Sequence, residues 1–286
     1  MRIHPQAIVY PTAQLGQDVV VGPFSIIEAG VVLGDRCVLA SHVVVKQGTT
    51  MGADNLVSEG VVIGGLPQHV KMPERTGTLV IGRGNTIREN ATIHRALAED
   101  HATRIGDSNM LMVATHVAHD CQVGNNTIFA NGAMIAGHVL VEDRAYVSGA
   151  VAVHQFCRIG RLAMVGGHAR VSKDIPPFTM IDGTTGLVVG LNTIGLRRNG
   201  VSSDEIARIK AAYRVIYRSG LKWSEILDRL HGEFSAGLAA NFYEFLADSH
   251  RGITQERRLP PGATIKLRDM EDEIESQEIP RRAKAG

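Results

Sequence analysis

An apolar residue recurs at every sixth position of this chain, from Leu15 to Val171. The period breaks only at residues 69–80 and 99–104, and it resumes in the same register after each break. An α-helix cannot keep such a pattern on one face, because its period is 3.6 residues. Short strands separated by sharp corners can keep it. Three hexads per coil then form a triangular prism whose first and fifth positions point inward.

Glycine often occupies the second position of a hexad, as at Gly16, Gly22 and Gly34. We predict that these glycines allow a tight bend after each short strand. The repeat resembles that of the hexapeptide-repeat family of left-handed parallel β-helices, a known exception to the right-handed crossover rule. The resemblance implies an all-β, left-handed parallel β-helix over residues 1–177, with loop excursions near 69–80 and 97–104.

The segments that follow the repeat have different patterns. Pro176-Pro177 ends the coil, and residues 178–200 predict an irregular, Gly-rich connection. Residues 201–253 predict a C-terminal α-helical domain, because Ser202 offers an N-cap before acidic residues and a periodic apolar face. Residues 254–286 are rich in charged side chains, and we expect this tail to be poorly ordered.

Composition restricts the class of function. A net charge of +1 provides no electrostatic field for nucleic acid. The sequence contains no apolar stretch long enough for a transmembrane segment and no secretory leader, so we expect a cytoplasmic protein. The cysteines all fall on the fifth, inward position of a hexad, which favours reduced, buried packing residues over a disulfide or a metal site: Cys37, Cys121 and Cys157.

A parallel β-helix by itself defines no chemistry, so the site must come from polar residues at its corners. His119, His138 and His154 are separated by about one 18-residue coil and are therefore predicted to line one edge of the prism. Because Val117 and Cys121 point inward, His119 and Asp120 between them lie at an outward corner.

Several interpretations of this histidine column remain open. His119 can act as a general base near neutral pH, with Asp120 stabilising the imidazolium that forms. The alternatives are a solvated corner histidine in a purely structural coil, and a zinc site of a hydratase on the same fold. His116, three residues before His119, can contact a substrate or cap a turn.

Several segments resemble the UDP-N-acetylglucosamine O-acyltransferase family of lipid A biosynthesis. They are His116-Val117-Ala118-His119-Asp120-Cys121, Ala136-Gly137-His138-Val139, Ala152-Val153-His154-Gln155-Phe156, Met164-Val165-Gly166-Gly167 and Thr92-Ile93-His94-Arg95. The resemblance covers residues 3–252 and implies transfer of an (R)-3-hydroxyacyl chain from acyl carrier protein to the 3-hydroxyl of UDP-N-acetylglucosamine. It also implies a homotrimer with active sites between subunits, and neither a metal nor a bound cofactor.

The resemblance assigns roles by position. His119 would be the general base, Asp120 its orienting carboxylate, and the Gly137 N–H the donor to the oxyanion. His116, His138, His154 and Gln155 would bind the nucleotide sugar or the acyl group. Lys71 would reach a neighbouring subunit's site, Asn192 and Arg198 would contact the uridine and the diphosphate, and Gly167 would gauge a long acyl chain.

Some positions depart from the family pattern. His69 stands where an acidic residue is common, and Ile194 and Asn199 replace polar or basic residues near the nucleotide. His168 and Arg170 are larger than the usual residues near the far end of the acyl groove. A changed partner near the sugar 3-position leaves open an acceptor that bears a 3-amino group, with the same acyl transfer.

Overall fold

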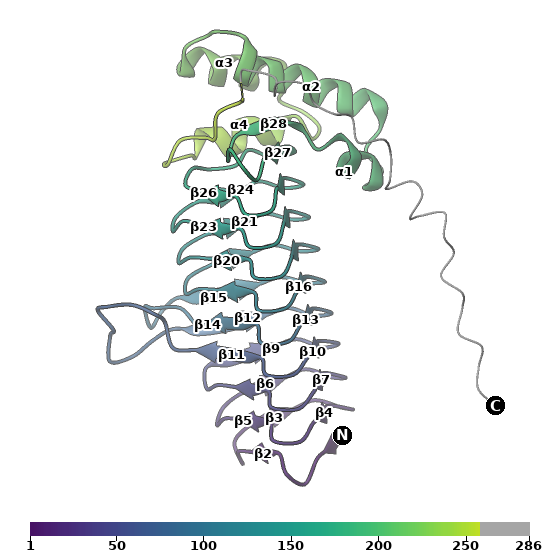
Figure 1. Ribbon diagram of the computed structural model, residues 1–286, viewed down its shortest axis with the longest axis vertical. Helices are drawn as coiled ribbons and strands as arrows, with labels where there is room; N and C mark the ends of the chain where they lie inside the picture. The colour runs from purple at the N-terminus through teal and green to yellow at the C-terminus, as the bar shows by residue number, and fades with distance from the viewer. Residues whose placement is uncertain (258–286) are drawn as a thin grey trace, which may run out of the picture. The chain divides into compact units, whose positions relative to one another are not determined.

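The structure is a computed structural model that describes residues 1–257. Within that range, short strands stack into three sheets, and the chain visits each sheet in turn (Figure 1). The strands of successive coils are parallel and in register, so that Val117 pairs with Ile135 and Ile135 with Val153. The repeat therefore folds into a parallel β-helix, as the six-residue period predicts.

Sheet A contains β1 (Arg2–Ile3), β4 (Val20–Val21), β7 (Val38–Leu39), β10 (Leu56–Val57), β13 (Thr86–Ile87), β16 (Met110–Leu111), β19 (Ile128–Phe129), β22 (Tyr146–Val147), β25 (Met164–Val165), β27 (Thr179–Ile181) and β28 (Val188–Leu191). Sheet B contains β2 (Ile8–Val9), β5 (Ile26–Ile27), β8 (Val44–Val45), β11 (Val62–Gly65), β14 (Thr92–His94), β17 (His116–Val117), β20 (Met134–Ile135), β23 (Ala152–Val153) and β26 (Arg170–Val171). Sheet C contains β3 (Gln14–Leu15), β6 (Val32–Leu33), β9 (Thr49–Met51), β12 (Thr78–Ile81), β15 (Ala102–Ile105), β18 (Gln122–Val123), β21 (Leu140–Val141) and β24 (Arg158–Ile159).

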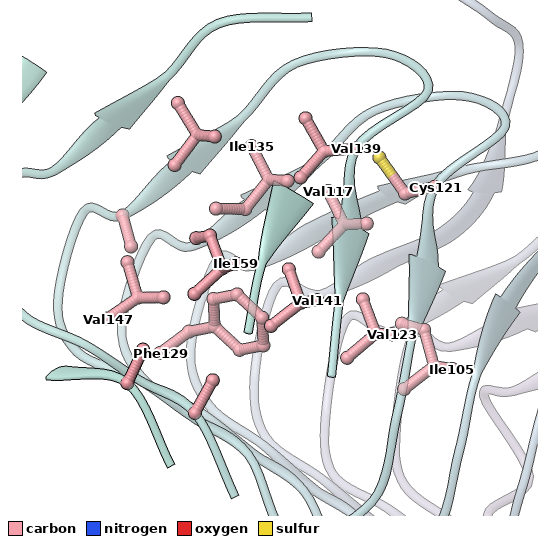
Figure 2. Close-up of a cluster of buried hydrophobic side chains, with 14 of the residues drawn as sticks. Ile105, Val117, Cys121, Val123, Phe129, Ile135, Val139, Val141, Val147 and Ile159 are labelled. Atoms are coloured by element: carbon pink, nitrogen blue, oxygen red, sulfur yellow. The ribbon is translucent and has the colours of Figure 1, made fainter. Parts of the chain in front are cut away.

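The core fills the inside of the prism. The first and fifth residues of the hexads are buried almost throughout, and Figure 2 shows such side chains meeting from all three sheets. The three cysteines are among these buried side chains and are unpaired, in agreement with a packing role. Burial raises the pKa of the Cys121 thiol to about 12, so this sulfur remains a neutral packing atom at ordinary pH.

The glycines at the second hexad position have a role different from the predicted bend. The left-handed backbone conformation falls two residues later, at the fourth position, as at Arg36 (φ 56°) and Asp120 (φ 60°). At Gly34, a Cβ atom would lie 2.6 Å from the backbone nitrogen of Ala53 in the next coil. Glycine is needed there because adjacent coils approach too closely for a side chain.

Both breaks in the repeat occur at the same corner of the prism, between sheets B and C. The first excursion connects β11 to β12, and it extends sideways from the stack in Figure 1. The second connects β14 to β15 in the coil that follows. Backbone hydrogen bonds join the two excursions, from Gly77 N–H to Ala96 O (2.9 Å) and from Thr78 N–H to His101 O (3.0 Å).

Residues 178–200 are more regular than expected. β27 continues sheet A beside β25, and β28 returns antiparallel to it. The short helix α1 (Thr193–Arg198) follows. A parallel coil leaves open strand edges at its end, and this hairpin covers the edge of sheet A.

Three helices complete the described part of the chain: α2 (Ser203–Arg218), α3 (Trp223–Glu233) and α4 (Ala240–Ala247). The Ser202 hydroxyl caps α2 as predicted, by accepting from Glu205 N–H at 3.2 Å. The first residues of the expected charged tail are held in place, since the Tyr213 and Tyr217 hydroxyls donate to Glu256 Oε1 and Thr254 O. The rest of that tail, residues 258–286, lies outside the described residues.

None of the helices within residues 1–257 is both long enough and apolar enough to span a membrane.

Candidate active site

The catalytic candidates lie at the corner between sheets B and C, one coil beyond the second excursion. His119 and Asp120 follow β17, and Gly137 and His138 follow β20 at the same corner of the next coil. Asp120 and His138 both adopt the left-handed conformation, with φ near 60°. The His138 N–H donates to His119 O at 3.0 Å, which fixes the spacing of the two corners.

His119 and Asp120 form a buried pair. The His119 Nδ1 atom lies 2.7 Å from Asp120 Oδ2, and only 10% of the histidine side chain and 6% of the aspartate side chain are exposed. Because an ionised carboxylate only accepts hydrogen bonds, Nδ1 carries the proton in this contact. The lone pair of neutral His119 is therefore on Nε2, where it is available to accept a proton.

Asp120 remains ionised in this position. Burial alone would raise the pKa of its carboxyl, but the hydrogen bonds from His119 and from Leu97 N–H, with the nearby charges of His138 and His119, hold that pKa below its ordinary value. The carboxylate can thus orient His119 and stabilise an imidazolium.

Gly137 is required by the ring of His119. A Cβ atom at Gly137 would lie 2.7 Å from His119 Cε1 and 2.8 Å from His119 Nε2. The imidazole therefore packs directly on the glycine backbone. Within residues 1–257 the Gly137 N–H donates to no acceptor, so this donor is available at the glycine on which the His119 ring packs.

The structure brings two of the three predicted column histidines together. The rings of His119 and His138 are in edge contact at 5.1 Å, but His138 then stacks on Phe156 at 4.6 Å. His154 and Gln155 are exposed, and the His154 ring has one polar contact within residues 1–257, from Nδ1 to Gln155 O at 3.1 Å. The strand register explains this, because an exact 18-residue repeat places Phe156, and not His154, over His138.

Three further histidines lie near this corner: His116 on β17 itself, His94 on β14 one coil earlier, and His69 in the first excursion. His116 Nδ1 is 2.8 Å from Thr92 Oγ1, and its ring contacts that of buried His94 at 4.9 Å. Burial and the neighbouring charge of His119 lower the pKa of His116. The ring of His69, in the first excursion, contacts His119 edge-on at 5.9 Å. The excursion therefore reaches His119 of its own chain.

The residues at this corner could also hold a metal ion. The ligand atoms of His119, Asp120 and His138 lie within 4.8 Å of one another. This set differs from the column of three histidines on which the alternative zinc interpretation rests, because it contains Asp120 and not His154. To bind through Nδ1, His119 would have to give up the hydrogen bond to Asp120.

Comparison with known proteins identifies the family. The family model described as UDP-N-acetylglucosamine O-acyltransferase, domain 2, matches residues 174–254, and the bacterial transferase hexapeptide model matches residues 12–47 and 102–137. The acyl-(acyl-carrier-protein)–UDP-N-acetylglucosamine O-acyltransferases of Halorhodospira halophila and Janthinobacterium sp. are 43% and 46% identical over 88% of this chain and 98% of their own length. The chain belongs to the UDP-N-acetylglucosamine O-acyltransferase family.

Solved structures of this acyltransferase family have the same fold. The UDP-N-acetylglucosamine acyltransferase of Francisella novicida matches with a TM-score of 0.87 at 34% identity, covering 90% of this chain and 95% of that one. The enzyme of Bacteroides fragilis matches with a TM-score of 0.85 at 39% identity, covering 88% of this chain and 99% of that one. The fold is thus a left-handed parallel β-helix with a C-terminal helical domain, as predicted.

The remaining positions that the acyltransferase resemblance singled out differ in burial and in hydrogen bonding. Both amide atoms of Asn192 are already bonded to the chain, Oδ1 to Gly195 N–H and Nδ2 to Leu162 O. Arg198 is exposed at the end of α1. Lys71 is exposed, and its backbone N–H lies 3.1 Å from His69 Nδ1. The roles of these three side chains stay predictions.

Gly167 lies at a different corner, between sheets A and B. A Cβ atom there would meet Gly149 O at an ordinary 3.5 Å, so the coil itself has room for a larger residue. Glycine at this position leaves open surface, in contrast to Gly137.

Sequence reasoning missed three contributors to the site. Leu97 donates to Asp120 through its backbone, His101 lies beside the same carboxylate, and Phe156 supports His138. A signal for the first two was present, because the second break in the repeat falls one coil before His119 at the same corner. A backbone donor has no sequence signature, and an excursion of irregular length hides which of its residues reaches back.

Proposed function

We propose that this protein transfers an (R)-3-hydroxyacyl chain from acyl carrier protein to the 3-hydroxyl of UDP-N-acetylglucosamine, the first step of lipid A biosynthesis, with His119 as general base. The observation that carries the proposed mechanism is the His119–Asp120 pair. The Nδ1–H of His119 is bound to the carboxylate, and the ring edge that carries Nε2 packs on Gly137, whose N–H would be the oxyanion donor. This arrangement can remove a proton and stabilise an oxyanion at one place.

The proposed reaction needs no cofactor, because every proton and electron pair moves between the two substrates and His119. His119 Nε2 takes the proton of the sugar hydroxyl as its oxygen attacks the thioester carbonyl carbon. The carbonyl electron pair moves to oxygen, where the Gly137 N–H donates a hydrogen bond to it. Collapse of this intermediate breaks the carbon–sulfur bond, and His119 returns the proton to the departing thiolate. Asp120 stays ionised throughout.

The outer face of sheet B suits a hydrocarbon donor. Met134, which is 49% exposed, and Ala152 lie on this face between the His119 corner and the Gly167 corner. An acyl chain that reached the open surface at Gly167 would be a long one, as the family resemblance implies.

The test is an acyl transfer assay with purified protein, acyl carrier proteins that bear 3-hydroxyacyl chains of several lengths, and UDP-N-acetylglucosamine. We expect transfer with a preference for long chains, and Gly167→Met is expected to shift the preference to shorter ones. Absence of transfer with every donor would overturn the proposal.

The 3-amino analogue of the sugar is the second candidate acceptor. The contact of His69 with His119 favours this acceptor. His69 stands where the family commonly has an acidic residue, so the group next to the proposed base differs from the usual one. Competition between the two nucleotide sugars for one donor decides the question. A strong preference for UDP-N-acetylglucosamine would remove the 3-amino candidate.

A zinc-dependent hydratase makes a different prediction from the acyltransferase. Metal analysis of purified protein, followed by activity measurement after chelation, separates the two. Stoichiometric zinc whose removal abolishes acyl transfer would contradict the proposed mechanism.

The outer face of sheet A supports a homotrimer. Eight of the outward residues on its successive strands are apolar: Val20, Val38, Leu56, Met110, Ile128, Tyr146, Met164 and Met180. Leu56 is 50% exposed and Val38 39%, which is unusual for a lone chain and typical of an interface. We therefore propose that copies pack through this stripe in a cytoplasmic trimer, with active sites between subunits.

A further inference from the structure

The second excursion holds Asp120 from several sides. Leu97 N–H donates to Asp120 Oδ2 at 3.0 Å, and the buried Thr103 hydroxyl accepts from Asp120 N–H at 2.8 Å. His101 Nδ1 lies 3.5 Å from Asp120 Oδ1. These three residues span the break in the repeat, so the break supplies contacts that a regular hexad corner would not.

One oxygen of the carboxylate depends on His101. The two hydrogen bonds to the Asp120 side chain, from His119 and Leu97, both end on Oδ2. Oδ1 is buried and has no hydrogen bond from residues 1–257, and a buried charged oxygen without a partner is costly. His101 can supply the missing donor, because its side chain is 60% exposed and able to adjust by a few tenths of an ångström.

The orientation of His101 suits this role. Its Nε2 lies 4.0 Å from Asp100 Oδ1 while its Nδ1 faces Asp120, so the ring lies between two carboxylates. The backbone of His101 is anchored as well, since its carbonyl accepts from Thr78 N–H in the first excursion at 3.0 Å. An Arg75–Glu99 ion pair at 3.2 Å joins the two excursions again at the surface.

We propose that the second excursion, residues 97–103, positions the catalytic carboxylate, and that His101 is a positioning residue for the His119–Asp120 pair. The inference rests on the proposed acyltransferase mechanism. His101 contacts no reacting atom in this account. It holds Asp120 Oδ1, so that Oδ2 stays aligned with His119 Nδ1 and Nε2 keeps its lone pair toward the acceptor.

The kinetic test compares substitutions at His101 that differ in where they place a donor. His101→Ala is expected to lower kcat about tenfold with KM for both substrates unchanged, because binding groups are not touched. His101→Asn places an amide nitrogen where Nδ1 lies and is expected to recover kcat to within about threefold. His101→Gln places it one bond farther and should behave as His101→Ala. Glu99→Gln, at the surface of the same excursion, is the control and should match the parent protein.

A double-mutant cycle with Asp120→Asn shows whether the effect passes through the carboxylate. In that background His101→Ala is expected to change kcat less than twofold, since the alignment it supports is already lost. The inference is overturned if His101→Ala retains kcat within twofold of the parent. It is also overturned if His101→Ala loses the same factor in the Asp120→Asn background.

A spectroscopic readout separates this inference from the proposed function. In protein labelled with ¹⁵N-histidine, the Nδ1–H resonance of His119 should persist in the parent and in His101→Asn, and should broaden by exchange with water in His101→Ala. If the parent transferred no acyl group, the proposed function would fail, and this resonance would still decide the positioning role. A resonance unchanged in His101→Ala would refute it.

Discussion

At the scale of single residues, the candidate site depends on a glycine and a histidine of adjacent coils that pack directly on each other. The His119 ring packs on Gly137, with Cε1 and Nε2 close to where a Cβ atom of that residue would lie. The sequence predicted these two residues and Asp120 through spacing and resemblance. It does not predict that Phe156 supports His138, because the spacing of 16 residues from His138 to His154 is close to one 18-residue coil and favours His154 instead.

The contact between Gly137 and His119 predicts a large effect of one methyl group. Gly137→Ala should lower kcat by about 10²-fold, because the added Cβ displaces the imidazole and the donor beside it. Gly167→Ala is the matched control, since its Cβ has ordinary room and its kcat with a long donor should stay within about threefold. Steady-state kinetics check both. Equal effects of the two changes would contradict this account of Gly137.

Buried His94 predicts a pH dependence of stability. Burial, with the charges of His116 and His119, lowers the pKa of His94 from 6.5 to about 4. Between pH 4 and pH 6.5, His94 therefore binds a proton in the unfolded chain but not in the folded one. The free energy of unfolding should therefore fall by about 2 kcal/mol as the pH decreases from 6.5 to 4.

Substitution isolates the contribution of His94. His94→Asn should flatten this pH dependence in urea unfolding measured from pH 7 to pH 4. His250→Asn, at a side chain that is 91% exposed, should leave the slope as in the parent. An unchanged slope in His94→Asn would rule out this origin of the pH dependence.

At the scale of elements, the hexad predicted the strands well because inward positions are set by the period alone. In β20, Ile135 points into the prism and is fully buried, while its neighbour Met134 is 49% exposed. The connection at 178–200 was predicted less well, since β27 and β28 lack the period and are formed by pairing with the end of the coil. The excursions were located, but their mutual hydrogen bonds come from backbone atoms that a sequence does not distinguish.

The alternation of inward and outward side chains in β20 predicts that substitutions at two adjacent residues change the free energy of unfolding by different amounts. Ile135→Ala should lower the free energy of unfolding by about 3 kcal/mol, because it leaves a cavity in a packed core. Met134→Ala should change it by less than about 0.5 kcal/mol in an isolated subunit. Urea unfolding of both variants gives the comparison. Similar losses would argue against the inward and outward assignment.

At the scale of the whole molecule, the stack of coils repeats each outward position as a column. The sheet A column is an apolar stripe, and the corner between sheets B and C carries the candidate site. The period predicts that such columns exist, but it does not predict which of them would face another copy, since that depends on a second surface. The net charge of +1 predicts no nucleic-acid partner, and it gives no indication of a protein partner either.

The apolar stripe predicts the effect of charge on assembly. Val38→Glu combined with Leu56→Glu should convert the proposed trimer to monomers, because two carboxylates would be buried without partners. Thr50→Glu, on the exposed outer face of sheet C, should remain trimeric. Light scattering coupled to size-exclusion chromatography measures the mass of each. A trimer that survives the double substitution would place the interface elsewhere.

The transfer rate of His119→Ala shows most directly whether His119 removes the proton of the acceptor in an acyl transfer. Single-turnover transfer from 3-hydroxyacyl carrier protein to UDP-N-acetylglucosamine should fall by at least about 10³-fold, with the protein still assembled and still binding the nucleotide sugar. Transfer at a rate within tenfold of the parent protein would contradict this role of His119.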